Sequence, residues 1–141
     1  MNIGGRQTIS GIEIIMVQAI HSSSTVEEDA NLYLGPAAAY MLRFEDGRVV
    51  YFAGDTALFG DMRLLGERHA PGLAFLPIGD LFTMGPEEAA IAADWVGAKI
   101  VVPMHYGTFP VLTGTPDEFR RFCEPRGIKV VEMHPGEQIS L

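Results

Sequence analysis

The sequence predicts an α/β fold in which apolar strands alternate with helices. Three short apolar runs carry this prediction, at residues 49–54, 73–79 and 100–104. The stretches between them are long enough for a loop and a helix, which is the pattern of parallel βαβ units. The runs end at Asp55, Asp80 and His105. Open α/β sheets bind ligands beyond the carboxyl ends of their strands, so these side chains are candidates for chemistry.

The N-terminal half is predicted to contribute antiparallel strands to the same sheet. Residues 12–20 form a first apolar strand, and a polar, acidic loop is expected over 22–31. Apolar runs at 40–44 and 49–52 flank Asp46-Gly47, and Asp-Gly between two β-rich runs is a strong hairpin signal. This hairpin indicates a mixed sheet rather than a purely parallel one.

Helices are predicted in three places. Residues 58–69 carry apolar side chains at helical spacing. Pro86 is followed by two glutamates, which favours a helix start because Pro suits the first turn and acids suit the positive end of the helix dipole. A third helix is expected over 116–124, and two short strands are expected over 128–133 and 138–141.

Bulk composition narrows the function classes. At 141 residues the chain is expected to form a single domain, spanning residues 1–141. The net charge of −8 argues against nucleic acid or an anionic membrane as the main partner. Cys123 is the only cysteine, so an intrachain disulfide is excluded and a cytoplasmic location is expected. No apolar stretch approaches the roughly 20 residues of a membrane span.

His21, Asp55 and His105 each follow a predicted strand, and together they suggest a metal site. Two imidazoles and a carboxylate suit Zn²⁺, with Mn²⁺ and Fe²⁺ as alternatives. Simpler roles stay open at this point. His21 could be a solvated residue at a strand end, Asp55 the N-cap of the helix that follows it, and His105 a core histidine.

Asp80 lies in a loop between a strand and a helix start, bracketed by Gly79 and Gly85. Such glycine-flanked loops let the backbone come close to a ligand. The alternative is a turn in which Asp80 caps its own loop.

Several segments resemble the metal-dependent hydrolases of the metallo-β-lactamase superfamily. They are residues 51–56 (Tyr-Phe-Ala-Gly-Asp-Thr), 76–90, 102–110, 18–23 and 34–40. The most similar branch comprises small, mostly uncharacterised bacterial and archaeal hydrolases, distantly like ascorbate-6-phosphate lactonase. The resemblance covers nearly the whole chain.

This resemblance implies a four-layer αββα sandwich with one or two metals between its sheets. His21 then completes the first metal site, Asp55 bridges two metals, and His105 binds the second. Asp80 and Thr83 match a loop that lines the active site, and Tyr106, beside His105, is a third substrate-binding candidate. The implied activity is hydrolysis of a small-molecule ester, lactone or phosphoester by a metal-bound water; the sequence assigns no catalytic residue beyond the ligands.

The family's His-x-His-x-Asp-His signature is absent from these 141 residues. The chain is therefore expected to correspond to the C-terminal part of the sandwich, with one apolar sheet face uncovered. Such a face marks an interface, so the expected partner is a second copy or a complementing N-terminal chain. Two alternatives are an inactive or partner-binding α/β module and, less favoured, a mononuclear iron site.

Overall fold

The structure, a computed structural model, describes residues 1–140 and contains one large mixed sheet. Its seven strands lie in the order β1-β2-β5-β6-β7-β8-β9. The pairs from β1 to β6 are antiparallel, and those from β6 to β9 are parallel, so the predicted α/β class with a mixed sheet is confirmed. The strands are β1 (Arg6–Ile9), β2 (Ile12–Gln18), β5 (Ala38–Arg43), β6 (Val49–Phe52), β7 (Leu73–Pro77), β8 (Ile100–Met104) and β9 (Lys129–Val130).

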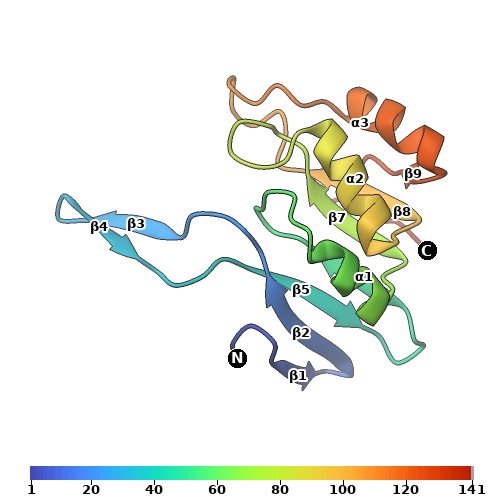
Figure 1. The fold of residues 1–141 in the computed structure, drawn as a ribbon, viewed down its shortest axis with the longest axis horizontal. Coiled ribbons are helices and arrows are strands. Elements are labelled where there is room, and N and C mark those ends of the chain that lie inside the picture. Colours follow the sequence, from blue (N-terminus) through green and yellow to red (C-terminus); the bar gives the residue numbers. More distant parts are fainter. Residues whose placement is uncertain (141) are drawn as a thin grey trace.

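Helices cover one face of this sheet. Figure 1 shows them side by side in front of the strands. The main core lies between the two layers, and its largest fully buried side chains include Tyr51, Met41 and Leu76 from the sheet and Phe119 from a helix. The helices are α1 (Met62–His69), α2 (Pro86–Val96) and α3 (Pro116–Cys123), followed by the 3₁₀ turn η1 (Glu124–Arg126).

The opposite face of the sheet carries a second, smaller apolar cluster and no helix of the described residues. Side chains alternate across a strand, so Val50, Leu73 and Val102 point away from the main core. Phe52 and Phe75 lie on this side with ring centroids 5.5 Å apart, and Phe52 is 41% exposed. We call this surface the open face; its apolar character agrees with the expectation from the sequence.

The predicted hairpin is confirmed as β5–β6. The Phe44 amide donates to the Arg48 carbonyl, and Gly47, at φ +85°, returns its amide to the Phe44 carbonyl. Glycine tolerates this left-handed conformation without steric cost. The three central apolar runs are likewise confirmed as the parallel strands β6, β7 and β8.

The expected loop over 22–31 is wrong. Residues 24–33 form a separate two-stranded antiparallel sheet, β3 (Ser24–Glu27) and β4 (Ala30–Tyr33). The turn lies at Glu28 and Asp29, both with positive φ. The sequence does not predict this hairpin because all of its strand residues are exposed. Without a buried face, the strands lack the alternation of apolar and polar residues by which a strand is recognised.

Other predicted boundaries shift. The first strand ends at Gln18, before the predicted 20, and β1 was not predicted because its residues are all exposed. The start of the first predicted helix moves from 58 to Met62, since residues 59–61 form turns instead. The predicted strand 128–133 shrinks to β9, and residues 138–140 are not a strand; Leu141 lies outside the described residues.

The C-terminal segment leaves the ladder to cover part of the open face. Val131 still donates its amide to the Val101 carbonyl, and Val131, Met133 and Ile139 then pack against the Val50, Leu73 and Val102 cluster. Burial against that cluster replaces sheet pairing, which explains why β9 is short.

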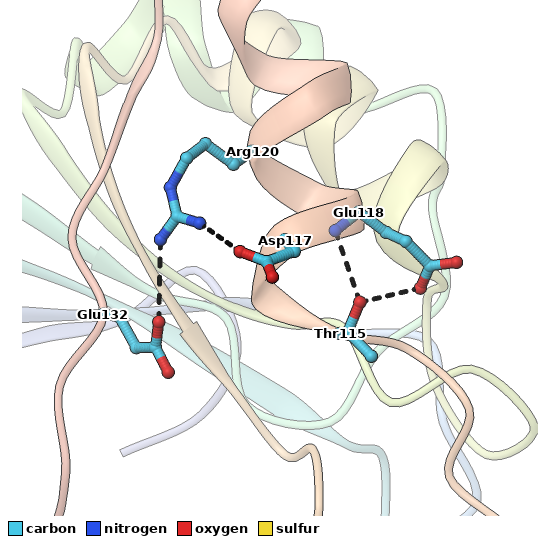
Figure 2. A network of polar contacts seen from close by, with 5 residues as sticks. All are labelled: Thr115, Asp117, Glu118, Arg120 and Glu132. Atoms are coloured by element: carbon cyan, nitrogen blue, oxygen red, sulfur yellow. Dashed lines mark hydrogen bonds and ion pairs between the residues drawn. The ribbon is translucent and has the colours of Figure 1, made fainter.

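Polar contacts fix the start of α3 (Figure 2). The Thr115 hydroxyl accepts the Glu118 amide at 3.3 Å and donates to the Glu118 carboxylate at 2.9 Å. Arg120 bridges Asp117 at 2.6 Å and Glu132 at 3.6 Å, and so ties the helix to the segment after β9. In residues 1–140 the structure has no helix both long and apolar enough to cross a membrane.

The Thr115 cap should contribute measurably to stability. Replacing Thr115 with Ala removes the acceptor for a helix N–H and should lower the free energy of unfolding by about 1 kcal/mol. Thr115→Ser keeps the hydroxyl and is the control. Urea denaturation of both variants measures the difference, and equal midpoints would show that the cap contributes nothing.

Gly66 should tolerate no side chain. A Cβ at this position would collide with the Trp95 carbonyl and with Val96 backbone atoms 2.8 Å away, at the end of α2. Gly66→Ala should therefore destabilise the protein by about 1–3 kcal/mol, despite the better helix propensity of alanine. Gly60→Ala is the control, because its Cβ meets open space. Thermal melts compare the two, and a neutral Gly66→Ala would disprove the close α1–α2 contact.

Candidate metal centre

The strand directions bring four sequence-predicted residues to one edge of the sheet. β5 runs antiparallel to both β2 and β6, so β2 points the same way as β6, β7 and β8. Their carboxyl ends therefore meet at the same edge, the usual ligand site of open α/β sheets. The residues that follow these ends are His21, Asp55, Asp80 and His105.

A pocket of about 590 Å³ opens at this edge. It brings together the three predicted metal ligands and Thr83, while Asp80 and Tyr106 are not part of its lining. The apolar side chains of Ile20, Leu81 and Phe82 also line the pocket. The full lining is Ile20, His21, Ser22, Asp55, Ala57, Leu81, Phe82, Thr83 and His105.

Asp55 and His105 face each other across this pocket. Their Oδ2 and Nε2 atoms are 3.7 Å apart, and the side chains are 46% and 23% exposed. The alternative role of Asp55 as a helix N-cap is wrong, because α1 starts only at Met62 and its N-cap position is Asp61. The alternative of a fully buried core histidine is also wrong for His105, whose ring reaches the pocket.

Gly79 sets the position of His105. A Cβ on Gly79 would collide with the His105 carbonyl and come within 3.1 Å of its Nδ1. His105 itself has φ +55°, a left-handed conformation rare for a residue with a side chain. Its Nδ1 is buried without a hydrogen-bond partner among the described atoms. The strand-end backbone therefore aims the Nε2 edge of the ring at Asp55.

His21 lies in the same pocket but is held by backbone carbonyls. Its Nδ1 is 2.7 Å from the Ser22 oxygen and its Nε2 is 3.1 Å from the Phe82 oxygen. To bind a metal, one ring nitrogen has to leave its carbonyl. The contact with Phe82 also links the end of β2 to the loop after β7.

Thr56 connects the segments that carry the candidate ligands, and sequence reasoning did not single it out. It is completely buried, and its hydroxyl accepts the Ile20 amide at 3.0 Å and donates to the Ala57 carbonyl at 2.9 Å. Its carbonyl accepts the Met84 amide at 3.2 Å. Thr56 thus joins the neighbours of His21 and Asp55 to the loop after β7. The only feature of the sequence that could have indicated this role is the place of Thr56 in the segment Gly-Asp-Thr.

Asp80 turns away from the pocket. Its carboxylate accepts the Leu81 amide at 2.9 Å and the Thr113 hydroxyl at 3.1 Å, and it lines an adjoining cavity of about 380 Å³. Asp80 and Leu81 both have positive φ, so this loop is locally strained. The Asp80 contacts match the capping alternative, and its substrate-binding role stays a prediction.

Thr83 and Tyr106 occupy different surroundings. Thr83 lines the pocket and donates its hydroxyl to the Met84 carbonyl at 3.4 Å. Tyr106 packs half-buried against the main core. Burial, and then the charges of Glu132 and Glu137, raise the pKa of Tyr106. Its substrate-binding role also stays a prediction.

The donor atoms of this chain do not complete a metal site. Within residues 1–140, no group of three or more His, Cys, Asp or Glu side chains lies close enough to hold an ion. Asp55 and His105 form a pair of suitable chemistry, and His21 is in the same pocket but bonded to carbonyls. The chain therefore presents an incomplete set of ligands.

Sequence comparison identifies the family. Residues 1–106 match the model of the beta-lactamase superfamily domain. A "UPF0173 metal-dependent hydrolase" of Geobacillus thermodenitrificans is 49% identical over 142 residues, covering 100% of this chain and 62% of the relative. One of Solibacter usitatus is 46% identical over 140 residues, covering 99% of this chain and 61% of the relative.

Structural comparison agrees. Igni18, described as a novel metallo hydrolase from Ignicoccus hospitalis, superposes with a TM-score of 0.84 at 39% identity, covering 99% of this chain and 58% of that protein. The chain thus spans about three fifths of the length of the relatives it matches. The family model matches most of the chain, and the relatives match along its whole length. The chain therefore belongs to the family of the beta-lactamase superfamily domain, and its homologues are metal-dependent hydrolases.

Proposed function

We propose that this chain is the C-terminal part of a metal-dependent hydrolase that acts on a small-molecule ester, lactone or phosphoester. Its ligands toward the metal are His21, Asp55 and His105, and Zn²⁺ is favoured over Mn²⁺ and Fe²⁺ for two imidazoles and a carboxylate. The main support is the approach of Asp55 to His105, 3.7 Å apart, in the pocket that also contains His21.

The remaining ligands come from a part of the domain that this chain does not contain. The relatives are longer by about two fifths of their length, and the open face is apolar enough to receive a second layer. A depression of about 430 Å³, lined by Phe44, Val50, Leu73 and Ile100, lies on that side. The partner on this face is a complementing N-terminal chain or a second copy, and the location is the cytoplasm.

A second candidate is an inactive or partner-binding module. The observation that favours it is the lack of a three-donor cluster in residues 1–140. It differs from the first candidate in predicting no metal binding that depends on Asp55 or His105.

Metal binding separates the two candidates. His105→Ala removes one member of the facing pair, and Zn²⁺ affinity should fall at least about tenfold, because only Asp55 then faces the pocket from the β6 and β8 ends. His134→Ala is the control, since His134 is absent from the pocket lining. Isothermal titration with Zn²⁺ measures both. Equal affinities for the wild type and both variants would support the inactive module.

The open face should bind an apolar dye. Phe52 is exposed there and Phe75 is half-buried, so the wild type should enhance the fluorescence of anilinonaphthalene sulfonate or self-associate. Phe52→Ser should reduce either signal. Phe109→Ser is the control and should not, although Phe109, which lies outside this cluster, is 56% exposed against 41% for Phe52. A monomer by light scattering that binds no dye would contradict an unpaired face.

A further inference from the structure

The β3–β4 hairpin extends away from the sheet and the helices as a separate ribbon (Figure 1). We call residues 23–34 the arm. All eight of its strand residues are exposed, and within residues 1–140 its two strands pair with each other alone. An isolated two-stranded hairpin is marginally stable in water, so an arm of this kind is expected to gain stability from something that covers it.

The arm carries large apolar side chains on both of its faces. Val26 and Tyr33 are 68% and 75% exposed, and the register Ser24↔Tyr33 and Val26↔Asn31 puts them on the same face. Leu32, on the other face, is 40% exposed, and Leu34 just beyond the strand is 63% exposed. A tyrosine and three aliphatic side chains on a narrow ribbon are typical of an interface rather than of a solvated loop.

The tip of the arm is acidic and forms an ordered two-residue turn. Glu27, Glu28 and Asp29 follow one another, and positive φ at Glu28 and Asp29 gives the two-residue turn whose twist suits a hairpin. None of these three carboxylates forms an ion pair within the described residues. The tip therefore presents three uncompensated negative charges on a preformed element.

A groove beside α1 has the complementary character. It measures about 320 Å³; Ile3, Phe59, Leu64 and Leu65 supply apolar walls, and Arg6 and Arg68 lie at its border. Leu64 is 61% exposed although it lies on α1, one of the helices that cover the core. The groove is thus apolar, open and large enough to accept an aromatic side chain.

The charge around this groove is positive although the whole chain carries −8. Burial, and then Arg43, Arg68 and Arg6, lower the pKa of His69 in the groove, while Glu13 acts in the opposite direction. Glu13 pairs with Arg6 and Arg43 at 3.5 Å, and Asp61 also lines the groove. Arg68 forms no ion pair with any described residue and is free to meet a carboxylate.

We propose that the arm of one copy docks into the α1 groove of a second copy, and that two copies exchange arms reciprocally. Val26 or Tyr33 fills the apolar groove, and the acidic tip meets Arg68. A second copy is the occupant because the unpaired acidic, apolar arm and the unpaired arginine beside an apolar groove are complementary surfaces of the same chain. Reciprocal exchange closes the assembly as a two-fold dimer.

Disulfide trapping tests this contact directly. Tyr33→Cys and Leu64→Cys proteins are prepared separately, mixed and oxidised, and a covalent heterodimer should form. Tyr33→Cys mixed with Val111→Cys, which is 52% exposed in wild type and absent from the groove lining, is the matched control. Cys123 should not interfere, because it is buried and burial raises the pKa of its thiol to about 11.

Charge exchange within the same cysteine pair tests whether the acidic tip of the arm meets Arg68. Glu27→Lys with Glu28→Lys in the Tyr33→Cys protein should lower the trapped yield about tenfold, and Arg68→Glu in the Leu64→Cys partner should restore it. The neutral pair Glu27→Gln and Glu28→Gln, which cannot repel Arg68, should give an intermediate yield. Higher salt should weaken trapping of the unmodified pair.

Two results would overturn the proposal: a trapped yield no greater than that of the Val111→Cys control, or a yield indifferent to charge reversal and restoration. The experiment does not depend on metal binding or on hydrolysis. Association through the open face would raise all trapped yields alike and leave the difference between Leu64→Cys and Val111→Cys unexplained, so the two interfaces are distinguishable.

Discussion

The pairing of β5 between β2 and β6 is the constraint on which the candidate site depends. Because β5 runs against both neighbours, β2 acquires the direction of β6, β7 and β8, and His21 reaches the edge where Asp55 and His105 lie. Were β2 to pair with β6 directly in the antiparallel sense, His21 would stand at the opposite edge. The hairpin at Asp46-Gly47 and the hydroxyl of Thr56 then secure this arrangement at its two ends.

The central part of the fold follows from local rules in the sequence. Buried strands β6, β7 and β8 are continuous apolar runs, Asp-Gly marks a hairpin, and Pro86 with two glutamates marks α2, so each is recognisable on its own. The exposed elements were not recognisable. β1, β3 and β4 bury no face, so their residues have no reason to alternate, and β9 is cut short by packing of Val131 and Met133 that depends on distant residues.

The sequence predicts which residues lie at the candidate site, but not which atoms their side chains contact. Polar residues after strand ends identified His21, Asp55 and His105, which the pocket brings together. Strand ends do not specify side-chain direction, so the sequence could not show that His21 binds two carbonyls or that Asp80 turns toward Thr113. The sequence gives no sign of the role of Thr56, because that role lies in hydrogen bonds to the distant residues Ile20 and Met84.

The order of strands in the sheet has a consequence for how the chain folds and varies. Apart from the arm, each strand lies beside the strand that follows it in the chain, so the sheet can grow by successive addition. Turns join the antiparallel pairs, and crossovers through α1, α2 and α3 join the parallel pairs. Contacts between successive strands span shorter stretches of sequence than pairings between distant strands would, and a lower sequence separation of contacts favours faster folding. The arm is an insertion between two such neighbours, β2 and β5. Because lengthening a loop adds only slowly to its closure entropy, the arm can change in length without disturbing the register of the sheet or the edge that carries the candidate ligands.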